Sequence, residues 1–230
     1  MKINSKFFLL IMVMLLSFSL AVSCDKEKNN GISEETNSEA ENSDRMIMVN
    51  GKLYRDTGYV DSCVECGTAD GEILTSVSET ETPKKDKESN FGEGYPYQLL
   101  YESHVIVNIN RKWIIFQDVT ISEAGIPDTV ANFLAEVSEA SDNSLLVNVN
   151  YLPKNFRWIF DNQRENMIKP ISINIENLAI LENGNEISPE ELIGKTVKVW
   201  FDGAIKTENP EMSSPTELGE VYKVEIFKKD

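Results

Sequence analysis

Short runs of β-branched and aromatic residues, separated by tight-turn pairs, constrain the fold of this chain more than any other feature. Residues 46–56 alternate around Asn50-Gly51, a pair that suits the type I′ turn of a β-hairpin. Residues 105–116 form a second such pair of runs around Asn110-Arg111. Two hairpins of this kind predict a small β-rich module, which we place at residues 45–118.

The second half of the chain has the same character. Residues 133–149 hold two alternating runs around a polar turn, and residues 196–201 alternate again. Between them, Ser188-Pro-Glu-Glu191 is a capping box with proline at the first helical position, so a single helical turn should precede the strand. A short helix among strand pairs is typical of an OB-like Greek-key barrel. We therefore predict a mainly β protein, with residues 119–131 as a linker and residues 132–228 as the barrel.

The first 44 residues have the pattern of an export signal and a tether. Lys2 and Lys6 precede an apolar run at residues 7–20, which is short for a helix that must cross a ~30 Å hydrocarbon core. Small residues then lead to Cys24. This arrangement resembles a bacterial lipoprotein signal, residues 1–23, whose cleavage leaves Cys24 to be acylated; a plain secretory signal is the alternative. Residues 24–44 are polar and acidic, and we expect them to be a disordered tether.

The charge balance excludes some partners. The chain has 38 acidic and 22 basic residues and a formal net charge of −16. Such a surface repels nucleic-acid phosphates, so we expect no nucleic-acid partner. An acylated Cys24 would bind the membrane without a basic patch, because two acyl chains give stable anchoring.

Cys63-Val-Glu-Cys66 is the motif with the most obvious chemistry. A reactive dithiol needs a lowered thiol pKa beside positive charge, whereas Asp61 and Glu65 surround this pair. A zinc site needs about four ligands, and the motif with one histidine does not supply them. We expect a local disulfide between Cys63 and Cys66, with free thiols and a redox or metal role as alternatives.

The sequence assigns no catalytic residue, cofactor or metal. His104, the one histidine, lies beside an apolar run, and the residues around it do not form the serine–acid arrangement of a nucleophile relay. The recognised hydrolase, nucleotide and zinc motifs are absent from the sequence. With 38 carboxylates, any pair could be nominated as acid and base, which makes that signal uninformative.

Residues 154–169 depart from the charge trend, with four basic and two acidic residues. Here Arg157 could contact a carboxylate or phosphate, and Trp158 could stack on a sugar or another planar group. We favour a structural interpretation over this binding role. Phe156, Trp158 and Phe160 recur with a period of two, as on the buried face of a strand.

Two stretches resemble families of extracytoplasmic bacterial proteins. The first resembles a short module of secreted Gram-positive proteins, carried by Met48 to Tyr54, Asp56-Thr-Gly58, Cys66-Gly67, Asp70 to Ile73, Asn90-Phe-Gly92, Gly94-Tyr95 and Tyr97-Gln98. The second is similar to a small OB-like domain of lipoproteins, carried by Asn183 to Ile187, Gly194 to Val197, Asp202 to Ile205 and Val221-Tyr222. The polar stretch at residues 207–219 is longer than the corresponding loop of that family. These resemblances imply location and fold, not an activity.

Together these patterns predict a lipid-anchored protein on the outer side of the cell membrane that acts as a binding or adaptor protein of the envelope. Its expected partners are the membrane, through Cys24, and an envelope carbohydrate or protein. The alternative function is an enzyme that hydrolyses envelope carbohydrate or peptide.

Overall fold

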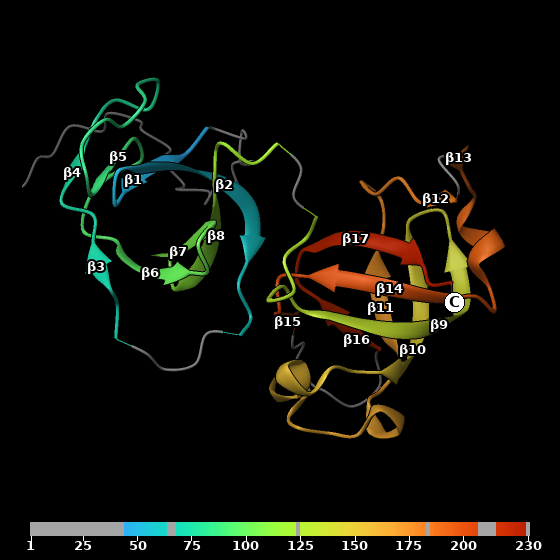
Figure 1. Ribbon diagram of the computed structural model, residues 1–230. Coiled ribbons are helices and arrows are strands. Elements are labelled where there is room, and N and C mark those ends of the chain that lie inside the picture. Colours follow the sequence, from blue (N-terminus) through green and yellow to red (C-terminus); the bar gives the residue numbers. More distant parts are fainter. Residues whose placement is uncertain (1–43, 64–67, 123–124, 183–184, 207–214, 229–230) are drawn as a thin grey trace, which may run out of the picture. The chain divides into compact units, whose positions relative to one another are not determined.

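The computed structural model describes residues 44–63, 68–122, 125–182, 185–206 and 215–228, and these are mainly β-structure (Figure 1). The strands belong to two large sheets and one small pair. The first large sheet comprises β1 (Met46–Val49), β2 (Lys52–Val60), β3 (Gly71–Glu72), β4 (Thr75–Ser76), β5 (Glu88–Ser89), β6 (Pro96–Leu100), β7 (His104–Ile109) and β8 (Lys112–Asp118). Within the described residues its order is β3-β6-β7-β8-β2-β1-β5-β4.

Both predicted hairpins of this sheet are present. Asn50 and Gly51 have φ angles of 52° and 73°, and β1 pairs with β2 directly around them. Asn110 and Arg111 have φ angles of 52° and 67° between β7 and β8. Two successive positive φ angles match the twist of the flanking strands, which is why these turns fix the register.

The first sheet curls so that its two edges meet in one chain segment. The edge strands β3 and β4 are separated only by Ile73 and Leu74. The Ile73 N–H donates to the Tyr95 carbonyl at 3.0 Å, and the Leu74 N–H donates to the Lys87 carbonyl at 2.8 Å. Ile73 is fully buried in the core of this sheet. Each edge is therefore only two residues long, which limits edge-to-edge pairing with other chains.

The second large sheet is drawn from the later residues. It comprises β9 (Asn132–Ser141), β10 (Ser144–Tyr151), β11 (Ile171–Asn174), β14 (Thr196–Phe201), β15 (Ile205–Lys206), β16 (Thr216–Leu218) and β17 (Val221–Ile226). Their order in the described residues is β15-β16-β11-β10-β9-β14-β17, and β11 pairs with β16 in parallel. The small pair is β12 (Leu181–Glu182) with β13 (Asn185–Glu186), and the short 3₁₀ helices are η1 (Lys154–Phe160), η2 (Glu165–Met167) and η3 (Pro189–Leu192).

The alternating buried side chains of the second sheet form one hydrophobic core. Inward-facing residues of β9, β10 and β14 are buried, and η1 and η3 add side chains to the same cluster. The capping box at η3 is confirmed, because the Ser188 N–H donates to Glu191 Oε1 at 3.3 Å. The mainly β class is thus confirmed, and the division into two domains stays a prediction.

Residues 42–230 form one compact unit, in which a third apolar cluster joins side chains of both large sheets. Ile106 and Ile115 from the first sheet share it with Trp200 of β14. At its edge Lys112 Nζ lies 2.9 Å from Asp202 Oδ2, whose side chain is almost fully buried. Over the described part of the chain, no helix is both long and apolar enough to cross a membrane.

Candidate functional site

The segment that was expected as a buried strand around Trp158 is instead the 3₁₀ helix η1. Pro153 precedes it with φ −56°, and the Phe156 N–H donates to the Pro153 carbonyl at 3.0 Å. Asp161 ends it in the left-handed region, with φ 51°. The strand interpretation was therefore wrong. A 3₁₀ helix has three residues per turn, so Phe156 and Ile159 share the face that is buried in the core. Phe160 is buried at the end of the helix, whereas Trp158 is not buried.

Trp158 is 56% exposed, yet the structure holds its ring in place. Its Nε1–H donates to the Ser62 carbonyl at 3.3 Å. One helical turn earlier, the Asn155 side-chain amide donates to Cys63 Sγ at 3.1 Å. Residues three apart eclipse each other in a 3₁₀ helix, so both contacts lie on the same face of η1. The result is an oriented aromatic ring that remains open to solvent.

Arg157 has an internal partner. Its Nη2 lies 2.9 Å from Glu165 Oε1, which holds η2 against η1. The pKa of Glu165 is lowered, first by its hydrogen bond with its own backbone N–H and then by the Arg157 side chain. Arg157 therefore stabilises this loop, and 38% of its side chain remains exposed beside Trp158. We call Trp158, with the bases Lys154, Arg157 and Arg164, the Trp158 platform.

The structure brings one of the predicted cysteines close to this platform. Cys63 is partly buried, and burial is the main cause that raises the pKa of its thiol. It forms no disulfide within the described residues. Cys66 lies outside the described residues, as does Cys24, so the predicted disulfide and the predicted acylation both stay predictions.

His104 shows no relay geometry. Its Nδ1 lies 2.9 Å from the Ser103 hydroxyl, and burial lowers its pKa. In the part of the chain that the structure describes, its Nε2 atom is buried without a hydrogen-bond partner. The described surroundings therefore show no acid hydrogen-bonded to the imidazole.

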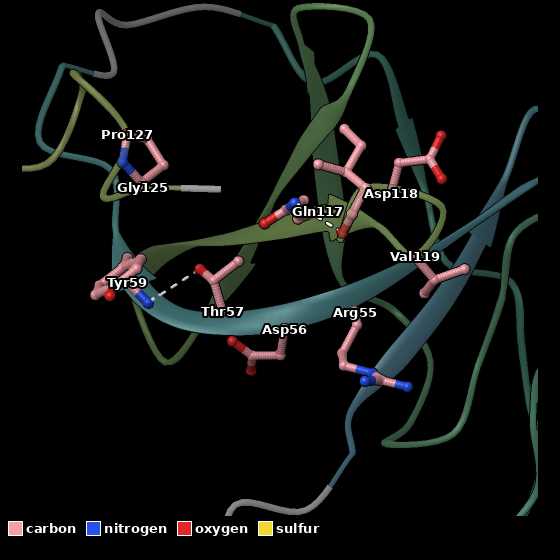
Figure 2. Close-up of a pocket in the computed structure, with 10 residues that line it drawn as sticks. Arg55, Asp56, Thr57, Tyr59, Gln117, Asp118, Val119, Gly125 and Pro127 are labelled. Atoms are coloured by element: carbon pink, nitrogen blue, oxygen red, sulfur yellow. Dashed lines mark hydrogen bonds between the residues drawn. The ribbon is translucent and has the colours of Figure 1, made fainter. Parts of the chain in front are cut away.

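A second candidate site, which the sequence did not predict, is a hollow over β2 and β8 (Figure 2). It is a hollow of about 260 Å³ between these strands and the predicted linker. The residues that line it are Arg55, Asp56, Thr57, Tyr59, Gln117, Asp118, Val119, Ile121, Gly125 and Pro127. Its walls are thus partly apolar and partly polar.

A β-bulge in β2 shapes this hollow. Asp56 pairs with Phe116 and Val60 with Ile114, so three residues of β2 face one residue of β8. The Thr57 hydroxyl fills the gap by donating to the Ile115 carbonyl at 2.7 Å. Bulges often lie beside functional sites. Gly58, inside the run of residues that forms β2, was the signal in the sequence that could have predicted this bulge.

The two carboxyl groups at the hollow are already used inside the protein. Burial raises the pKa of Asp56, whose carboxyl forms an ion pair with Arg45 and accepts from the Gly58 N–H at 2.6 Å. Hydrogen bonds from Thr120 lower the pKa of Asp118. In Figure 2 the Asp56 carboxyl and the Asp118 side chain lie on opposite sides of the β2 ribbon. The pair therefore does not converge on one reacting atom.

Comparison with known proteins adds no relative: the chain matches no family model, no curated protein and no solved structure. Among the described residues, no group of three or more His, Cys, Asp and Glu side chains is placed to hold a metal ion. The Trp158 platform and the β2–β8 hollow are the two candidate sites.

Proposed function

We propose that this chain is a lipid-anchored binding or adaptor protein on the outer side of the cell membrane, and that Trp158 contacts its ligand. The observation that carries the proposal is the exposed, oriented ring of Trp158. Burying a tryptophan is strongly favourable, so a ring held open to water forgoes that gain unless a ligand covers it. Rigid aromatic side chains lose little conformational entropy on binding, which suits them as ligand contacts.

The proposed location rests on the sequence. The basic start, the apolar run and the small residues before Cys24 favour export and acylation. If residues 25–44 are the tether that the sequence predicts, their root-mean-square reach would be roughly 25 Å. Such a tether would let the folded part reach envelope components near the membrane.

The proposed fold of the second sheet is an OB-like Greek-key barrel. Three register observations support it: β9, β10 and β11 pair in succession, β14 pairs with β9 and β17, and β11 pairs in parallel with β16. The strands β9, β10 and β11 thus form a meander, with β14 and β17 beyond β9 and with β16 and β15 beyond β11. Barrels of this class bind oligonucleotides and oligosaccharides on their strands and adjoining loops. The acidic surface makes a saccharide the better candidate of the two.

Binding is better supported than hydrolysis. A glycosidase needs two carboxyl groups on opposite sides of one reacting bond. At the β2–β8 hollow, Asp56 and Asp118 hold internal hydrogen bonds and ion pairs, and their side chains are almost fully buried. At the Trp158 platform, Glu165 is bound to Arg157.

A retention experiment tests the proposal. The full chain would be immobilised through a C-terminal tag and exposed to solubilised cell envelope, and retained sugar and protein would be quantified. We expect Trp158→Ala to lose the retained material. Tyr101→Asn is the matched control, because Tyr101 is 74% exposed and has φ 58°, a conformation that Asn tolerates. Equal retention by the parent and by Trp158→Ala would show that the platform is not the binding site.

A further inference from the structure

We infer that the ligand of the Trp158 platform is an anionic glycan, that is, a saccharide bearing phosphate or carboxylate groups. This inference rests on the proposed function and deepens it. It depends on which charged side chains surround Trp158 and on how the short helices position them.

Three basic residues belong to the segments around the ring: Lys154 and Arg157 lie in η1, and Arg164 lies at the start of η2. Lys154 and Arg157 are three residues apart in η1, so they eclipse each other about 6 Å apart along the helix axis. The contact between Arg157 and Glu165 brings η2 to the same edge, and Arg164 immediately precedes η2. Lys154 and Arg164 are exposed and have no ion-pair partner within the described residues.

This arrangement matches two features of a charged sugar at once. The face of the indole ring can stack on the apolar face of a sugar ring. A phosphate or carboxylate on the same sugar or its neighbour can then accept a charge-assisted hydrogen bond from Lys154, and Arg164 adds a second positive charge that Glu165 does not neutralise. A neutral sugar would use the ring but not the bases, which would remain solvated.

The Trp158 platform differs in charge from the rest of the chain. The full chain has a net charge of −16, whereas residues 154–169 have four bases and two acids. An anion is repelled by most of the surface, and at physiological salt that repulsion is screened beyond about 8 Å. An anionic chain would therefore bind where bases exceed acids.

The two acids of the segment set the direction of binding. Glu165 is neutralised by its contact with Arg157. Asp161 is exposed at the C-terminal end of η1, where it would repel an anion. The anionic group should therefore sit toward the Lys154 end of the helix. This placement makes a specific prediction, namely that Asp161→Asn strengthens binding. Asn is suited to the left-handed backbone at this position, φ 51°, so the change removes charge without strain.

The experiment uses the full chain, purified in detergent, and two pairs of soluble polymers. One pair is phosphomannan and mannan, and the other is polygalacturonate and its methyl ester. Each pair differs only in the presence of the anionic group, so the pairs separate phosphate from carboxylate as its source. Dissociation constants would be measured at two salt concentrations for the parent, Lys154→Gln/Arg164→Gln, Asp161→Asn and Trp158→Ala. Lys84→Gln/Lys85→Gln is the control, because it removes the same charge from exposed residues of the loop between β4 and β5.

We expect the anionic member of at least one pair to bind about tenfold or more tightly than its neutral partner, as charge-assisted hydrogen bonds predict. Lys154→Gln/Arg164→Gln should reduce that preference and its salt dependence, Asp161→Asn should increase the affinity, and the lysine control should change neither. Equal binding of both members of each pair, lost in Trp158→Ala, would overturn the anionic class and leave the proposed function intact. If none of the four polymers binds, the inference is also overturned, whereas the retention experiment still decides the proposed function. Anionic binding that survives Trp158→Ala would overturn both.

Discussion

Two aromatic residues of η1 should respond in opposite ways to truncation, although only one residue separates them. Phe156 is 1% exposed and belongs to the core cluster of the second sheet, whereas Trp158 is 56% exposed. The sequence alternation treats the two as equivalent. A buried strand would make both Phe156→Ala and Trp158→Ala strongly destabilising.

The structure assigns them different magnitudes. Phe156→Ala removes a fully buried ring and leaves a cavity, which costs about 3–5 kcal/mol of unfolding free energy. Trp158→Ala removes one partly buried hydrogen bond, to the Ser62 carbonyl at 3.3 Å. It also uncovers the part of the ring that is now buried, and the two losses together come to about 1–2 kcal/mol.

Urea unfolding of the purified protein, followed by circular dichroism, measures this difference. The free energies of the two variants should differ by about 1 kcal/mol or more, with an unchanged dependence on urea. Phe160→Ala, at a site that is 5% exposed, should behave like Phe156→Ala. Equal losses for Phe156→Ala and Trp158→Ala would refute the reasoning, because Trp158 would then be a core residue and could not serve as a ligand contact.

Three further predictions address the anchor, the histidine and the cysteine pair. Cys24→Ala should prevent lipid attachment, and a variant that still partitions into detergent with the parent's mass would contradict this. Burial lowers the pKa of His104 below the usual imidazole pKa of about 6.5. Between these two pKa values the unfolded state binds more protons than the folded state, so the free energy of unfolding should fall as the pH drops through this range. His104→Gln should remove this loss in urea titrations, and an imidazole that titrates at its usual pKa by NMR would argue against it. We expect Cys63 and Cys66 to be bridged, so intact-mass analysis of exported protein should show two hydrogens fewer than the reduced chain, and stoichiometric zinc would contradict the disulfide.

Local signals were enough for the hairpins and the capped turn. Asn50-Gly51 and Ser188 to Glu191 act through bonds within a few residues, so the sequence contains the whole reason for their conformation. The prediction of a strand at residues 154–160 was wrong for a related reason. The alternation of aromatic residues favoured a strand, although Pro153 is a residue that commonly stands at the start of a helix. In the 3₁₀ helix that forms, Phe156 and Phe160 are buried and Trp158 is exposed.

The two candidate sites depend on partners that are distant in the sequence. Trp158 is oriented by Ser62, which lies 96 residues earlier, and the bulge of β2 is completed by the Ile115 carbonyl. A sequence without its pairing register does not show which carbonyl a side chain will meet. Arg157 was identified as a candidate from its charge, but its contact with Glu165 became visible only in the fold.

The way the chain enters the first sheet determines how that sheet would bear mechanical load. Asn90 is almost fully buried, accepts a hydrogen bond from the Met46 N–H at 2.7 Å and donates another to the Asp44 carbonyl at 2.9 Å. A pull on the residues before Asp44 therefore meets this side chain before it reaches β1. Because β1 is paired with β2 on one side and β5 on the other, extracting it requires breaking both sets of hydrogen bonds and exposing Ile47 to water. Asn90 thus fastens the start of β1, where tension would enter this sheet if the chain were anchored through its earlier residues.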